Sequence, residues 1–149
     1  MGRMYSIVMD AQSISTAKDL ISVTAAADKA LVLHELNVTQ ESTETSDTGV
    51  VQIHRASGTA GVGASVVPRP LDAGDAAMSN GAFLTNLTTD ETPGNILLRR
   101  AFNVLTGFHW LPTPESRIVV PGQGIVVVRS DIAISAATVT AELIVEELG

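Results

Sequence analysis

Residues 137–148, with the sequence ATVTAELIVEEL, reveal the fold class most clearly. Apolar and polar side chains alternate along this stretch at every second position. Successive side chains of a β-strand point to opposite faces, so this period predicts a strand with one buried face. The predicted buried face carries Val139, Ala141, Leu143 and Val145, and the opposite face carries Thr138, Thr140, Glu142, Ile144 and Glu146.

Similar short runs, rich in β-branched residues and separated by Gly, Pro, Ser, Thr and Asp, occur along the rest of the chain. Helical periodicity is weak, and residues 15–21 and 71–78 predict at most a turn or two of helix each. We therefore predict an all-β fold, a β-sandwich or jelly-roll-like barrel, as one domain over residues 1–149 with 1–4 as a candidate N-terminal arm. The further predicted strands cover residues 5–11, 19–25, 30–40, 49–56, 96–105, 117–120 and 124–129.

Charge and composition exclude several classes of partner. The net charge of −7 repels phosphate backbones, so we expect no binding to nucleic acid. No apolar run reaches the ~20 residues that span a bilayer, and the first residues lack the long apolar region of a secretory signal, so we expect no membrane partner. The chain has no cysteine, which excludes thiol nucleophiles, cysteine zinc sites and iron–sulfur clusters.

The chain is also unusually aliphatic for its size. Hydrophobic residues make up 45% of it, charged residues 17% and aromatic residues 3%. This is more aliphatic surface than one small core commonly hides, which predicts that other copies of the chain cover part of it. The alternative is a monomer with a surface rich in Thr, Ala and Val.

No motif of a known chemistry is present. The sequence lacks the G-x-S-x-G of a nucleophile elbow, the short histidine spacings of a metal site and the G-x-G-x-x-G order of a phosphate loop. The three histidines lie on separate segments: we expect His34 in the core or at a subunit interface, His54 on a strand surface and His109 packed beside its aromatic neighbours. We therefore predict a protein that is not an enzyme and needs no metal or cofactor.

Two segments instead offer features suited to contact with a partner. Pro68 and Pro70 stiffen the backbone around Arg69, which suits either a contact arm or a rigid crossover between sheets. Trp110 is the only tryptophan and lies between Phe108 and two prolines, so it could anchor an interface or seal the core. Pro68, Arg69, Pro70 and Trp110 are the candidate partner-contact residues.

The chain resembles the small structural proteins encoded beside the capsid genes of tailed bacteriophages. The resemblance is carried by YSIVMDA at 5–11, PRPLD at 68–72 with DAA at 75–77, WLPTPE at 110–115 and AELIVEEL at 141–148. It implies a head decoration, or cement, protein that forms homotrimers and binds the major capsid protein on the outer surface of the virion. Clamping of this kind needs no active site, and joining three copies raises the effective affinity of weak contacts.

Other functions fit the same features. A glycan-binding or host-attachment module of a fibre or spike would use loops that carry aromatic and acidic residues, although aromatic residues are few here. A tail or head–tail connector component would assemble as a ring. Hydrolytic turnover that depends on His34 or His109 would instead indicate an enzyme.

Overall fold

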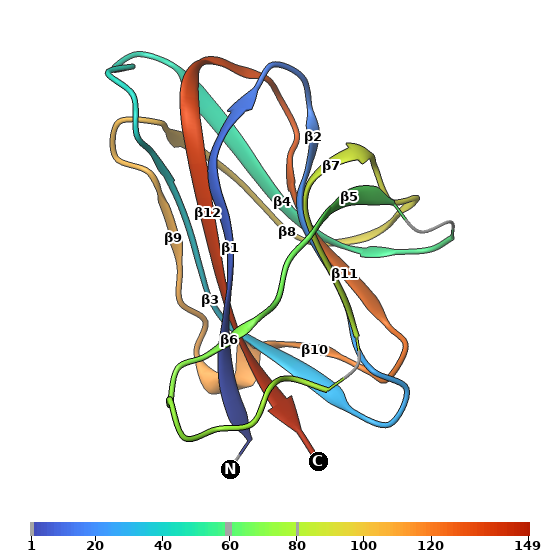
Figure 1. Ribbon diagram of the computed structural model, residues 1–149. Coiled ribbons are helices and arrows are strands. Elements are labelled where there is room, and N and C mark those ends of the chain that lie inside the picture. The colour runs from blue at the N-terminus through green and yellow to red at the C-terminus, as the bar shows by residue number, and fades with distance from the viewer. Residues whose placement is uncertain (1, 59–60, 80) are drawn as a thin grey trace.

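The computed structural model describes residues 2–58, 61–79 and 81–149, which form two antiparallel β-sheets packed face to face (Figure 1). The predicted β-sandwich is thereby confirmed. This described part of the chain contains no α-helix and one 3₁₀ turn, η1 (Pro114–Ser116), so the turns of helix expected at 15–21 and 71–78 do not form. The strands are β1 (Arg3–Ile14), β2 (Lys18–Thr24), β3 (Ala30–Gln40), β4 (Thr48–Ala56), β5 (Val62–Ser65), β6 (Arg69–Pro70), β7 (Ala82–Thr89), β8 (Pro93–Asn103), β9 (Phe108–Trp110), β10 (Ile118–Val120), β11 (Ile125–Ser130) and β12 (Ile134–Leu148).

The strand order is that of a jelly roll. Sheet A has the order β10-β3-β12-β1-β6, with β9 also paired to β3, and sheet B has the order β5-β7-β2-β11-β4-β8. Four nested antiparallel pairs underlie both sheets: β1 with β12, β2 with β11, β3 with β10 and β4 with β8. Alternate pairs fall in opposite sheets, as when one long antiparallel ribbon is rolled up, and this is the jelly-roll arrangement.

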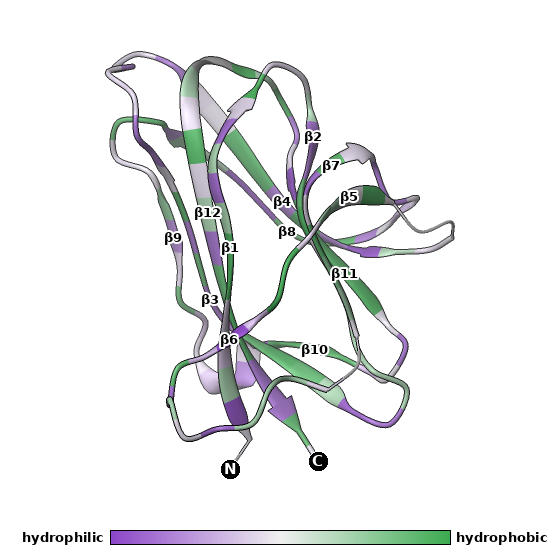
Figure 2. Cartoon of the chain, in the orientation of Figure 1, coloured by the Kyte–Doolittle hydropathy of each residue, from purple (hydrophilic) through white to green (hydrophobic). Residues whose placement is uncertain are grey.

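The core lies between the sheets and follows the alternation read from the sequence. Figure 2 shows apolar and polar residues alternating along β12. All four residues of the predicted inner face of β12 are buried, and Leu143 pairs with Ile7 of β1 on one side and Leu36 of β3 on the other. A continuous apolar row therefore crosses the middle of sheet A.

Residues 57–92 form an insertion between the paired strands β4 and β8. Its strand β7 extends sheet B beside β2, while β6 extends sheet A beside β1, so the insertion passes from one sheet to the other (Figure 1). The Tyr5 hydroxyl donates a hydrogen bond to the carbonyl oxygen of Ala76 at 3.0 Å, and the Leu71 N–H donates to the carbonyl oxygen of Met4 at 2.9 Å. These bonds fix the insertion against β1.

The N-terminal segment is part of sheet A. Arg3 pairs with Glu147 and Met4 with Glu146, and the Gly2 N–H donates to the Glu146 carboxylate at 2.8 Å. Residues 2–4 of the candidate arm, 1–4, therefore lie against β12 of the same chain. Residue 1 lies outside the described residues.

Candidate docking edge and buried polar cluster

The residues predicted to contact a partner do not form one surface. Arg69 is exposed on β6 at one edge of sheet A, between the buried Pro68 and the half-buried Pro70. Trp110 is half-buried on β9 at the other edge, paired with Leu36 and packed against the core. Strands β3, β12 and β1 separate the two sites, which therefore lie at opposite edges of sheet A.

The four sheet edges differ greatly in length. Strands β5, β6, β9 and β10 have four, two, three and three residues, whereas β8 has 11. Very short edge strands protect a sheet against unwanted pairing. Strand β8 has β4 on one side and no strand on the other within the described residues, so it presents the longest open row of backbone N–H and C=O groups.

Strand β8 combines exposed aliphatic side chains with two arginines. Ile96 and Leu97 are exposed in its first half, where two register shifts interrupt the pairing with β4, and pairing is regular from Leu98 onward. Arg99 and Arg100 occupy consecutive positions and therefore point to opposite faces of the strand. A strand with acidic residues on both faces would suit this edge, whereas a second copy of β8 would bring like charges together.

The two arginines have different local partners. Arg99 Nη2 lies 2.7 Å from Asp131 Oδ2. The guanidinium of Arg100 donates a hydrogen bond to the carbonyl oxygen of Arg99 at 3.0 Å, and it forms no ion pair within the described residues. Arg100 is therefore the positive charge of this edge that is open to a partner.

The segment that leads into β8 is tied down across the outer face of sheet B. We call Asp90, Glu91 and Thr92 the strap. The Asp19 N–H donates to Asp90 Oδ1 at 2.9 Å, and the Glu91 N–H donates to Asp19 Oδ2 at 2.8 Å. The Ser22 hydroxyl donates to Glu91 Oε1 at 2.7 Å, which adds a third link from the strap to β2.

Arg129 of β11 joins the strap to the sheet through charge. Its Nη1 lies 2.9 Å from Asp19 Oδ1 and 2.6 Å from Asp90 Oδ2, and its Nε lies 3.8 Å from Asp131 Oδ1. Burial acts to lower the pKa of Arg129, but its hydrogen bonds with Asp90 and Asp19 outweigh this and raise it. Burial also raises the pKa of Asp19, although the hydrogen bonds from Arg129 and the Glu91 N–H act to lower it.

His54 of β4 belongs to the same outer face and is fully buried. It pairs with Val127 of β11, which in turn pairs with Ser22, so the three side chains form one cross-strand row outside the main core. Among the described residues, neither ring nitrogen of His54 has a hydrogen-bond partner, and Glu91 Oε2 also has none. The expectation that His54 lies on a strand surface is wrong, because the strap and its flanking segments cover this face.

Burial is the main influence on the His54 ring. It lowers the pKa of His54, an effect that Asp19 and Glu91 oppose and that the positive charge of Arg129 reinforces. The imidazole is therefore neutral at neutral pH. No sequence motif marks this cluster, since its members come from β2, β4, β11 and the strap.

The other two histidines lie on sheet A, and so does a pocket beside the chain termini. His34 is half-buried and its Nε2 is 2.7 Å from Glu146 Oε2, while His109 is exposed and its Nε2 lies 3.0 Å from Glu35 Oε1.

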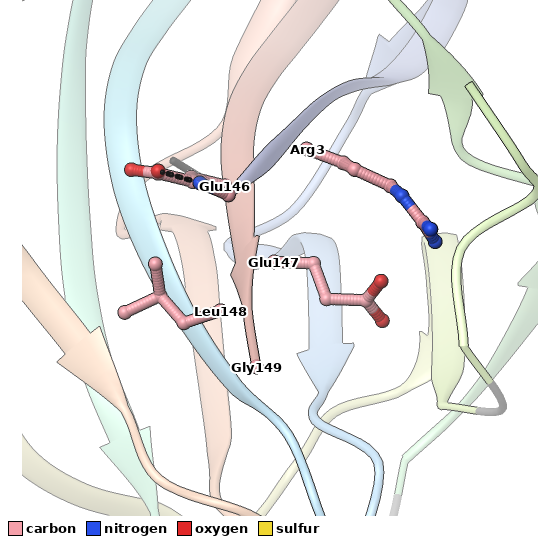
Figure 3. A pocket seen from close by; sticks show the side chains of 6 residues that line it. Arg3, Glu146, Glu147, Leu148 and Gly149 are labelled. Carbon is pink, nitrogen blue, oxygen red and sulfur yellow. Dashed lines mark hydrogen bonds between the residues drawn. The ribbon is translucent and has the colours of Figure 1, made fainter. Parts of the chain in front are cut away.

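A shallow pocket of about 470 Å³ opens beside the chain termini. This pocket lies over the paired strands β1 and β12, and Figure 3 shows Arg3 and Glu147 extending to one side of the pair and Glu146 and Leu148 to the other. Glu146, the partner of His34, is one of the residues that line this pocket.

Within residues 2–58, 61–79 and 81–149, no group of three or more His, Asp or Glu side chains is placed to hold a metal ion. The same part of the chain contains no helix long and apolar enough to cross a membrane. No protein-family model, curated protein or solved structure matches the chain.

Proposed function

We propose that this chain is a structural virion protein of the capsid-decoration type, which forms a homotrimer and docks on the outer surface of the capsid through β8. The long open edge of β8 carries the proposal. An extended segment of the major capsid protein would add to this edge by backbone hydrogen bonds, with acidic side chains facing Arg99 and Arg100. The resemblance to tailed-phage decoration proteins supports the same function.

Other properties of the molecule agree with a docking role. Exposed aliphatic side chains occur on β8 at Ile96 and Leu97, beside the two arginines. The jelly roll is also a frequent architecture of viral capsid proteins, although this is an argument from fold alone. Three copies held together would each supply one β8 edge, and simultaneous engagement would strengthen weak individual contacts.

The first experiment measures assembly and capsid binding separately. Light scattering after size exclusion should give a mass near three times 15.5 kDa. The purified protein should also sediment with expanded capsids of the virus that encodes it. A monomer that does not sediment with these capsids would overturn the proposed function.

Charge reversal at β8 tests the docking edge. Arg100→Glu should weaken capsid binding at least about tenfold and leave the trimer intact, because the variant repels an acidic strand at an exposed position. The matched control is Arg69→Glu, which reverses an exposed arginine on β6 of the other sheet. Loss of binding in Arg69→Glu with normal binding in Arg100→Glu would place the contact on the insertion and exclude β8.

A further inference from the structure

The strap encloses a histidine that has no partner for its ring nitrogens. Buried polar groups are almost always hydrogen-bonded, so Nδ1 and Nε2 of His54 are exceptions that need an explanation. A neutral imidazole has one donor and one acceptor, whereas an imidazolium has two donors and a positive charge. Enclosure without partners is therefore tolerated far better by the neutral ring than by the protonated one.

The charged groups around His54 come from each element packed against its face. Asp19 belongs to β2, Arg129 to β11 and Glu91 to the strap. On the other side of β4, strand β8 places the apolar Ile96 opposite His54. The carboxylates of Asp90 and Asp131 also lie in this cluster, as partners of Arg129.

Three of the four carboxylate oxygens of Asp19 and Glu91 are already engaged elsewhere. Both oxygens of Asp19 accept hydrogen bonds, from Arg129 and from the Glu91 N–H. Glu91 Oε1 accepts the Ser22 hydroxyl, and Glu91 Oε2 makes no hydrogen bond. The closed strap therefore contains negative charge near His54 but no hydrogen bond to either ring nitrogen.

We infer that His54 is an acid-sensitive latch: uptake of a proton by its imidazole opens the strap and releases the first half of β8. The strap can open locally because it lies outside the main core. Within the described residues, its polar links to the rest of the protein are the bonds to Asp19, Ser22 and Arg129 and the hydrogen bond from the Ser57 N–H to the carbonyl oxygen of Thr92. Segments with few apolar contacts open at lower free energy than core strands.

The direction of the response follows from proton linkage. Burial lowers the pKa of His54 in the closed form, so the open form binds the proton more tightly and acidification favours opening below about pH 6.5. Protonation of Asp19 has the opposite effect on the strap. The pKa of Asp19 is raised in the closed form, so its protonation favours closure. Asp19 therefore opposes acid opening and cannot account for it.

The latch also bears on docking, and this consequence rests on the proposed function. Thr92 is followed directly by Pro93, the first residue of β8. The first half of β8 is already irregularly paired with β4, with register shifts on either side of His54. An open strap would leave this half of the edge without its anchor, and capsid binding through β8 should weaken at acid pH.

Amide hydrogen exchange on the purified protein tests the latch without a capsid. From about pH 7.5 to about pH 5.5, the opening equilibrium of the strap should rise by up to about tenfold after correction for intrinsic exchange rates, because the open form takes up one proton with a pKa of about 6.5 and the closed form has a lower pKa. Peptides that contain Glu91 report the strap, and peptides from β12 serve as the internal control that should not change. Unchanged or increased strap protection at the lower pH would overturn the inference.

Substitution of His54 identifies the titrating group. His54→Met fills the space with an apolar side chain that does not titrate, so acidification in this range should no longer increase strap exchange. If His54→Met does not fold, His54→Gln replaces it in the same measurement. An undiminished pH response of strap exchange in the folded variant would assign the effect to another group and exclude the latch. Failure of the protein to bind capsids, by itself, would count against the proposed function and not against the latch.

Discussion

Replacement of Arg129 by methionine is expected to destabilise the protein by about 3–5 kcal/mol. The Arg129 side chain is only 18% exposed and lies between Asp19, which is fully buried, and Asp90 of the strap. Removal of the guanidinium leaves the Asp19 carboxylate buried without its cation, and an uncompensated buried charge is far costlier than the loss of a surface ion pair. Urea unfolding followed by circular dichroism at neutral pH measures the change.

The matched control for this prediction is Arg99→Met. Arg99 also pairs with an aspartate, Asp131, but its side chain is 55% exposed, so its loss should change stability by less than about 1 kcal/mol. Adding Asp19→Asn to Arg129→Met should recover part of the stability, because it removes the unpaired charge. Equal effects of Arg129→Met and Arg99→Met would show that burial does not govern the cluster.

The second large effect is expected in the core, where Leu143→Ala should lower stability by about 2–5 kcal/mol. Leu143 is completely buried and lies between Ile7 and Leu36 in the row across sheet A. Truncation to alanine removes apolar contacts and leaves a cavity that the three neighbouring strands cannot close without moving.

The matched control in this case is Leu111→Ala. Leu111 is 66% exposed, so the same truncation should change stability by no more than about 0.5 kcal/mol. Urea unfolding measures both variants. A loss below about 1 kcal/mol in Leu143→Ala would mean that the row is not a tightly packed part of the core.

Alternation along the chain was sufficient to predict most of the long strands. Residues 30–40 and 49–56 were predicted as strands and form β3 and most of β4, because side-chain period is a local property of the backbone. Strand β7 is not predicted from the sequence, because the inward position Thr85 is polar and the neighbouring Leu84 is apolar, which breaks the alternation. Strands β5, β6 and β9 are too short to produce a period of their own.

The candidate site was less accessible to sequence analysis. Arg69 and Trp110 were chosen for local composition, and only the pairing of the strands showed that three strands separate them. In β4, Val51 and Ile53 point into the core, so alternation assigned His54 to the outer face, which is correct. The error was to equate the outer face with solvent, because the strap that covers it lies more than 30 residues further along the chain.

The sequence by itself determined the all-β class, the approximate position of the longer strands and the inward face of β12. Each of these depends on residues within a few positions of one another. Only the tertiary structure decided the jelly-roll order, the open edge at β8 and the burial of His54 beneath the strap. Strands pair through backbone groups that are the same at every residue, so local sequence does not specify which strands become neighbours or which outer face a distant segment covers.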